Sequence, residues 1–165
     1  RFPADSLENL RGNVNTRLRK VVESNWHGAI FAAAGLERIG LRPENAISLD
    51  WMLPAPAQGA IMVVCKSGDD HCLEACTLLN DEDTELCTHI ERQFLRTLMG
   101  GCTTPISALA RVVDGLVLFE GSILNVDGTE KMAVNKSVLL SEARGLGNIA
   151  GEELLAMGAA RLLAK

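Results

Sequence analysis

The sequence lacks the features that mark several classes of protein. No apolar run is long enough to cross a bilayer, since the longest extends only from Ala29 to Leu36. No basic segment followed by an apolar one opens the chain, so no signal peptide is expected. Low-complexity tracts are absent, and 47% of the 165 residues are hydrophobic while 22% are charged. This composition excludes a disordered tail and favours a buried core of ordinary size.

Positive charge is also scarce. The chain has 16 basic and 21 acidic residues, for a net charge of −5. Attraction of the whole surface to nucleic acid or anionic lipid is therefore not expected, and we predict neither as a partner. Any anion that the protein binds must be held by a local cluster of Arg or Lys side chains.

The cysteines do not suit a secreted disulfide framework, because there are five of them, an odd number. We therefore expect a reducing compartment, the cytoplasm. The chain also begins at Arg1 without Met, from which we expect a piece of a longer product.

The first part of the chain alternates helical and strand-like segments. Apolar residues at helical spacing predict a helix over about residues 10–22, with Asn13 as its N-cap. Continuous apolar runs predict buried strands at Ala29–Ala34 and Ala60–Cys65, and a short helix follows the first of them. This part therefore predicts an α/β fold with a parallel sheet.

The second part has a different pattern. The acidic run Asn80–Asp83 predicts a helix start, and Asp114-Gly115 and Asp127-Gly128 predict turns between three strands. A final helix is expected to begin near Gly147–Gly151. The apolar face of the first helix would be formed by Leu86, Ile90, Phe94 and Leu98. The pattern predicts a small α+β domain of the order α-β-β-β-α.

Three arginines are candidates for an anion site. Arg11, Arg17 and Arg38 fall near predicted helix N-termini, at the carboxyl end of the predicted sheet. Helix dipoles favour anions there, and a guanidinium can donate two hydrogen bonds to one carboxylate or phosphate. The alternative interpretation is that all three are ordinary solvated side chains.

The cysteines allow two further interpretations. Cys72 and Cys76, with Cys87 and His89 nearby, invite a metal site, but their CxxxC spacing without a paired CxxC gives weak support and we expect no metal. Cys102 follows Gly100-Gly101 in a loop that would expose its thiol. On local sequence alone, a buried structural cysteine is the commoner arrangement.

Four segments together resemble the porphobilinogen deaminase (hydroxymethylbilane synthase) family. They follow the order and spacing of that family and are Leu10–Lys20, Ala33–Gly40, Pro54–Ala60 and Glu91–Ile106. The resemblance implies that residues 1–53 form the later part of a periplasmic-binding-protein-like α/β domain. It further implies that residues 54–78 form a crossover and a strand returning to a first domain. Residues 79–165 would form an α+β domain with a three-stranded antiparallel sheet.

The resemblance also implies a function, a transferase of tetrapyrrole and heme biosynthesis. Such an enzyme polymerises four porphobilinogen molecules into hydroxymethylbilane and releases ammonia. Its primer, a dipyrromethane cofactor, would be joined by a thioether to Cys102. Carboxylates of the cofactor and of the growing oligopyrrole would be bound by Arg11, Arg17 and Arg38. Gln58 and Gly59 would line the substrate cleft. Met99 departs from the family, which often has an acidic residue there.

The family's first domain and its catalytic aspartate would lie upstream of Arg1. The resemblance therefore implies no catalytic residue in this chain, inactivity without the upstream half, and a monomer when complete. We also expect exposed apolar surface at Ala60–Val64, a strand without its sheet. Two other functions stay open, a non-catalytic module that binds carboxylate or phosphate, and a metal-dependent regulator built on the Cys72 and Cys76 region.

Overall fold

The computed structural model describes residues 4–98 and 104–163. The chain divides into two compact units, Arg1–Ser48 and Leu49–Lys165. No helix in the described ranges is both long and apolar enough to span a membrane. The domain bounds expected from the resemblance, at 53/54 and 78/79, stay predictions.

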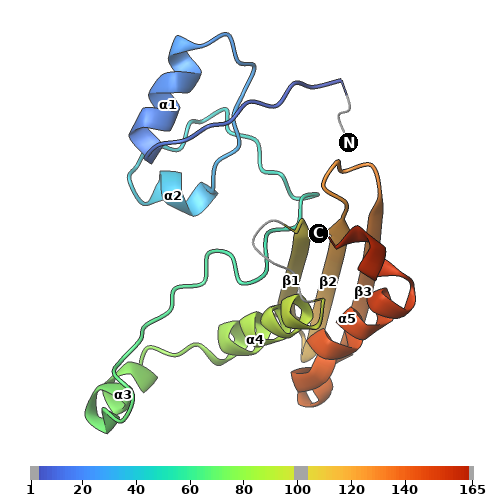
Figure 1. The fold of residues 1–165 in the computed structure, drawn as a ribbon. Coiled ribbons are helices and arrows are strands. Elements are labelled where there is room, and N and C mark those ends of the chain that lie inside the picture. The colour runs from blue at the N-terminus through green and yellow to red at the C-terminus, as the bar shows by residue number, and fades with distance from the viewer. Residues whose placement is uncertain (1–3, 99–103, 164–165) are drawn as a thin grey trace. The chain divides into compact units, whose positions relative to one another are not determined.

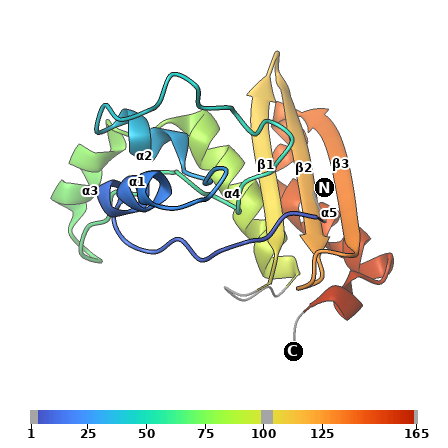
Figure 2. The ribbon, with the colours of Figure 1, turned by 90° about the horizontal axis from the view of Figure 1, so that it is seen from above.

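The first unit contains two short helices. Helix α1, Val14–Glu23, begins after Asn13, whose Oδ1 accepts a hydrogen bond from the Thr16 N–H at 2.9 Å. The predicted helix and its N-cap are thus confirmed. Helix α2, Ala33–Glu37, lies beside α1 in both views (Figure 1, Figure 2). Among residues 4–48, Leu36 is the one buried residue.

Two strand predictions are wrong for this structure. Residues 29–32 are irregular and Ala33 already begins α2, while residues 60–65 form no strand. A strand needs a hydrogen-bonded neighbour, and the described part of residues 1–79 contains no strand at all. The parallel sheet expected at this end is therefore not observed there. The expected exposure is confirmed, because Ile61 is 90% and Val64 79% exposed.

Helix α3, Asp70–Thr77, follows this irregular segment. Its N-cap is Asp69, whose side chain accepts the Cys72 N–H at 3.0 Å. The helix has no buried residue, and the apolar side chains of Leu73 and Leu78 around it are exposed. The CxxxC segment is thus helical, but it is not packed into a core.

The second unit contains the predicted α-β-β-β-α domain, which is confirmed. Helix α4, Glu82–Thr97, is capped by Asp81 and carries three acidic residues in its first turn. Strands β1 (Ile106–Val113), β2 (Leu116–Leu124) and β3 (Lys131–Leu139) form an antiparallel sheet in the order β1-β2-β3. A 3₁₀ turn, η1 (Leu140–Gly145), leads into helix α5, Leu146–Ala156, and a second 3₁₀ turn, η2 (Ala159–Leu162), follows.

The core of this domain lies between one face of the sheet and the pair α4 and α5 (Figure 1, Figure 2). Phe94 of α4 and Phe119 of β2 pack edge to face, with ring centroids 5.2 Å apart. Gly147 of α5 lies so close to α4 that an added Cβ would be 2.0 Å from the Ile90 carbonyl oxygen. Small residues therefore set the distance between the two helices.

The hairpin between β1 and β2 has the geometry that its sequence predicts. Asp114 and Gly115 have φ of +50° and +77°, and Val113 pairs directly with Leu116. A two-residue loop with both central φ angles positive is the turn that an Asp-Gly pair favours. The second predicted turn is also present, with Gly128 at φ +68° between β2 and β3.

Candidate functional site

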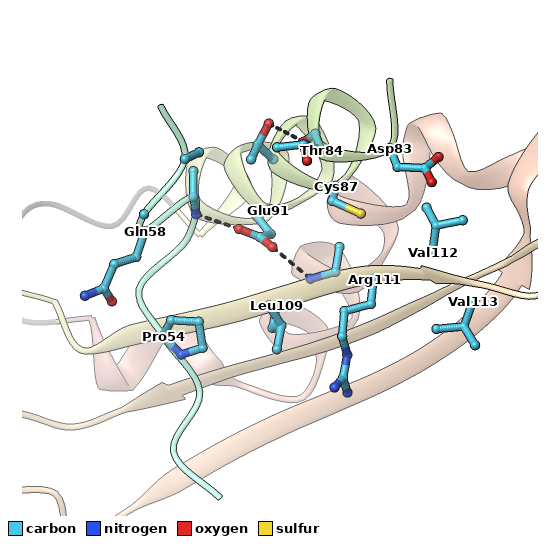
Figure 3. Close-up of a pocket in the computed structure, with 15 residues that line it drawn as sticks. Pro54, Gln58, Asp83, Thr84, Cys87, Glu91, Leu109, Arg111, Val112 and Val113 are labelled. Atoms are coloured by element: carbon cyan, nitrogen blue, oxygen red, sulfur yellow. Dashed lines mark hydrogen bonds between the residues drawn. The ribbon is translucent and has the colours of Figure 1, made fainter. Parts of the chain in front are cut away.

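A cavity of about 490 Å³ lies in the second unit, between α4, β1 and the segment Pro54–Ala60. Figure 3 shows this cavity with Gln58 on one side and Cys87 and Glu91 on the helix that faces β1. Gln58 and Gly59, both predicted to line a cleft, are among the residues that line it. The structure thus brings these two predicted residues together with part of α4.

Glu91 is the buried charged side chain at this cavity, only 5% exposed. Its Oε2 accepts a hydrogen bond from the Ala57 N–H at 2.6 Å, and its Oε1 accepts one from the Ala110 N–H at 2.8 Å (Figure 3). Burial raises the pKa of Glu91, and the hydrogen bonds from Ala110 and Ala57 oppose that shift. One carboxylate therefore connects α4, β1 and the Pro54–Ala60 segment.

The Pro54–Ala60 segment forms a tight turn. Ala57 has φ +58°, which is uncommon for a residue with a Cβ, and Gly59 has φ +86°. The Gln58 N–H donates to the Ala55 carbonyl at 3.0 Å, and the Gln58 Oε1 accepts the Ala55 N–H at 2.9 Å. The amide oxygen of Gln58 is used inside the turn, so its NH₂ group is the one that remains available to a ligand.

Cys87 lines the same cavity and is buried. Burial, with the negative charges of Glu91 and Asp83, raises the pKa of the Cys87 thiol above its usual range. A thiol in this setting stays protonated and is a poor nucleophile or metal ligand. Cys87 therefore has the properties of a structural side chain.

The three predicted arginines all lie in the first unit. Arg11 precedes the N-cap of α1 and Arg17 lies within that helix, whereas Arg38 is the C-cap residue of α2. The prediction that Arg38 lies near a helix N-terminus is therefore wrong, because α2 begins at Ala33 and ends one residue before it. The sheet edge proposed for all three is also absent from the described part of this unit.

The ion pairs of this unit distinguish these three arginines from their neighbours. Arg19 pairs with Glu23 at 3.8 Å, and Arg42 pairs with Glu37. Within the described ranges, the side chains of Arg11, Arg17 and Arg38 have no carboxylate partner. The Nε–H of Arg17 is buried and donates to no partner within the described residues. An unsatisfied buried donor of this kind suits an anionic ligand.

The remaining predicted residues are Cys102, proposed to anchor the cofactor, and the cysteines of the metal alternative. Cys102 lies outside the described residues, as do Met99, Gly100 and Gly101. For the metal alternative, Cys72 is exposed on α3 while Cys87 is buried on α4. Within residues 4–98 and 104–163, no three His, Cys, Asp or Glu side chains gather in a way that suits a metal ion. The structure thus gives the metal-dependent regulator no supporting site.

Glu91 is the residue of this site to which the sequence analysis gave no role, although it opens one of the family-like segments. A signal was present, because Glu91 lies one turn after Cys87 and one turn before Phe94, on the apolar face of α4. A carboxylate on such a face must find hydrogen-bond donors when it is buried. Which donors it finds depends on a segment more than 30 residues upstream, at Ala57.

Comparison with known proteins identifies a class of cofactor-dependent enzyme. Residues 1–74 match the family model described as porphobilinogen deaminase, dipyromethane cofactor binding domain. Residues 85–156 match the model described as porphobilinogen deaminase, C-terminal domain. Arg11, Arg17, Arg38, Gln58 and Gly59 lie in the first matched region, and Cys102 lies in the second.

The curated relatives agree with these models. The chain is 41% identical to porphobilinogen deaminase of Syntrophotalea carbinolica, over 99% of this chain and 53% of the relative. It is 40% identical to that of Syntrophobacter fumaroxidans, over 98% of this chain and 53% of the relative. The chain is 42% identical to the chloroplastic porphobilinogen deaminase of Pisum sativum, over 94% of this chain and 44% of the relative. This chain belongs to the porphobilinogen deaminase family, and it spans about half the length of these relatives.

Proposed function

We propose that this chain is the part of a hydroxymethylbilane synthase that carries the primer and binds the growing product. The whole enzyme would polymerise four porphobilinogen molecules into hydroxymethylbilane with release of ammonia. The observation that carries this proposal is the match of both halves of the chain to the two deaminase models. Residues 1–53 would then contribute to a periplasmic-binding-protein-like α/β domain.

The proposed attachment point of the cofactor is Cys102. A dipyrromethane supplies a pyrrole α-carbon to which further porphobilinogen units are joined. Its anchor must be a soft nucleophile that forms a stable bond to an electron-poor methylene carbon, and a thiolate meets that requirement. The thiol would be an anchor and not a turnover nucleophile, because the primer stays on the protein while the product is cut away.

The proposed carboxylate ligands are Arg11, Arg17 and Arg38. Each pyrrole unit carries an acetate and a propionate, so the bound chain gains two negative charges with every unit added. Within the described residues, these three arginines have no carboxylate partner and the buried Nε–H of Arg17 has no acceptor, and both observations support this role. In the second unit, the available NH₂ group of Gln58, beside Gly59, is a neutral donor that suits a carboxylate.

We further propose that turnover needs the part of the enzyme that this chain does not span. The chain covers 53% of the bacterial relatives, and no residue in it is assigned to stabilise the positive charge that develops on the pyrrole nitrogens. Loss of such preorganised charge costs orders of magnitude in rate. The purified 165-residue chain should form no measurable hydroxymethylbilane, and product formation by it would refute this part of the proposal.

A second candidate is a module that binds a carboxylated or phosphorylated ligand without chemistry. The three arginines without a carboxylate partner in the described part of the chain favour it as well, but it leaves Cys102 without a role. The variant Cys102→Ser separates the two, because ligand binding by a simple module survives the substitution whereas covalent cofactor attachment does not. We also propose that the protein is located in the cytoplasm and that the complete enzyme is a monomer. The odd number of cysteines supports the cytoplasmic location.

The decisive experiment measures the intact mass of the full-length protein, purified from cells and denatured. A mass increase equal to one dipyrromethane, lost in Cys102→Ser and retained in Cys87→Ser, is the expected result. A bare sequence mass in the full-length protein would contradict the proposed cofactor. Cys87→Ser is the matched control, because that thiol is buried and its pKa is raised.

A further inference from the structure

Glu91 occupies a position that disfavours an ionised side chain. It shares the buried face of α4 with Cys87, Ile90 and Phe94. A carboxylate there loses its hydration and must regain that energy from hydrogen bonds. An apolar residue of similar size usually fills such a site at no loss of stability. The carboxylate therefore calls for an explanation beyond packing.

The explanation lies in what the two oxygens bind. Each accepts one backbone N–H, from Ala57 at 2.6 Å and from Ala110 at 2.8 Å. Ala110 lies on the edge of β1 opposite to β2, where the strand has no neighbouring strand. The Ala108 N–H, two residues earlier on that edge, donates to the Pro54 carbonyl at 3.0 Å. The Pro54–Ala57 segment is thus attached to β1 at two points, one of them through Glu91.

The second point of attachment is at a strained residue. Ala57 has φ +58°, a left-handed conformation that is unfavourable for a residue with a Cβ. A segment outside regular secondary structure keeps such a conformation only when its surroundings impose it. The hydrogen bond from the Ala57 N–H to Glu91 adds a contact from outside the turn to the bonds between Ala55 and Gln58 within it. Gln58 is the next residue, so the conformation of Ala57 decides where the Gln58 side chain emerges (Figure 3).

We propose that Glu91 is a positioning residue, whose carboxylate fixes the Pro54–Gly59 turn against β1 and α4 so that Gln58 is held in place for the oligopyrrole chain. This inference rests on the proposed function, since it assigns Glu91 a role in presenting a substrate-binding residue. We assign Glu91 a positioning role and no substrate contact, because it is only 5% exposed and each of its oxygens already accepts a backbone N–H.

The first test is the exchange of the Ala57 and Ala110 amide hydrogens in the full-length enzyme. In Glu91→Gln, the side-chain oxygen can accept only one of the two N–H groups, and the new NH₂ group faces the other donor. We expect exchange to accelerate about tenfold or more at Ala57 or at Ala110, whichever N–H faces the new NH₂ group. The control Glu120→Gln makes the same chemical change on the half-exposed side of β2 and should leave both amides unchanged. Unchanged exchange at both Ala57 and Ala110 in Glu91→Gln would overturn the inference.

The second test is kinetic and asks whether Glu91 acts through Gln58. Glu91→Gln and Gln58→Ala should each raise the KM for porphobilinogen, and the double variant should be no worse than Gln58→Ala alone. A residue that only stabilises the fold would lower the melting temperature without this non-additivity. Effects of the two substitutions that multiply would contradict the inference. Glu91→Asp, which keeps the charge and shortens the side chain, serves the same cycle if Glu91→Gln does not fold.

The two proposals fail in different ways. A full-length protein without covalent dipyrromethane refutes the proposed function, whereas the exchange rates at Ala57 and Ala110 are measured without turnover and still test the attachment of the turn. A fully loaded and active enzyme whose Gln58 and Glu91 variants combine independently would retain the function and overturn the positioning role.

Discussion

Apolar side chains are buried in residues 82–163 and largely exposed in residues 4–79. In residues 82–163, the apolar faces of α4, α5 and the sheet meet one another, and Ile90, Phe94 and Leu154 are fully buried. In the described residues 4–79, Leu36 is the one buried residue, and Ile61 and Val64 are largely exposed. An apolar run therefore specifies a strand or a core only where the chain also supplies the surface that covers it.

The largest expected effect tests whether the core belongs to the second unit alone. Phe94→Ala removes a ring that is fully buried against Phe119 and should lower the free energy of unfolding by about 3–5 kcal/mol. Leu36→Ala, in the first unit, should change the same transition by less than about 0.5 kcal/mol. Urea unfolding followed by circular dichroism measures both. Equal losses in the two variants would mean that the two regions share one cooperative core.

A smaller effect is expected from the contact between α4 and α5. Gly147→Ala places a methyl group 2.0 Å from the Ile90 carbonyl oxygen, so the helices must separate. We expect a loss of about 1–3 kcal/mol in the free energy of unfolding. Gly145→Ala is the matched control, because no atom lies within 4 Å of its added Cβ, and it should stay within about 0.5 kcal/mol of wild type. Similar melting curves for the two variants would disprove the close approach.

Aspartate caps both α4, which packs into the core, and α3, which has no buried residue. Hydrogen bonds from the side chain and the backbone N–H of Thr84 lower the pKa of Asp81, which caps α4, and the backbone N–H and side chain of Cys72 lower that of Asp69, which caps α3. Asp81→Ala should lower the melting temperature at neutral pH, whereas Asp69→Ala should leave it unchanged because α3 has no buried residue.

The pH dependence of that difference has a definite sign. A carboxyl whose folded pKa is below its usual value stabilises the fold above the unfolded pKa, near 3.8 for Asp81. This contribution is lost as the pH falls through the lower, folded pKa. Melting curves from neutral to acidic pH should therefore bring wild type and Asp81→Ala together at the acidic end. A gap that widens on acidification would contradict the capping role.

The smallest effect is expected at the surface of the sheet. Arg111 of β1 and Glu120 of β2 form an ion pair at 2.9 Å, with both side chains well exposed. Because water and salt screen such pairs, Arg111→Ala should cost less than about 1 kcal/mol, and less still at high salt. Urea unfolding at low and high salt measures this. A salt-independent loss would mean that the stem of Arg111 contributes by packing.

Neighbouring residues by themselves determine several helix and turn positions of this protein. The Asn13 cap of α1, the acidic start and apolar face of α4, and the Asp114-Gly115 turn all follow from neighbouring residues, and all are present in the structure. The roles of Cys102, Gln58, Gly59 and the three arginines were inferred by resemblance to the family to which the chain belongs, and they stay predictions.

Tertiary structure decided the rest. Ala29–Ala34 and Ala60–Cys65 have the composition of strands and do not form them here, because the described chain offers them no hydrogen-bonded neighbour. The position of Glu91 on a helix face can be read from its sequence, but the two donors that its oxygens accept lie on segments far away in the chain. Strand pairing and the burial of a charge both depend on partners distant in sequence, and only the fold brings those partners together.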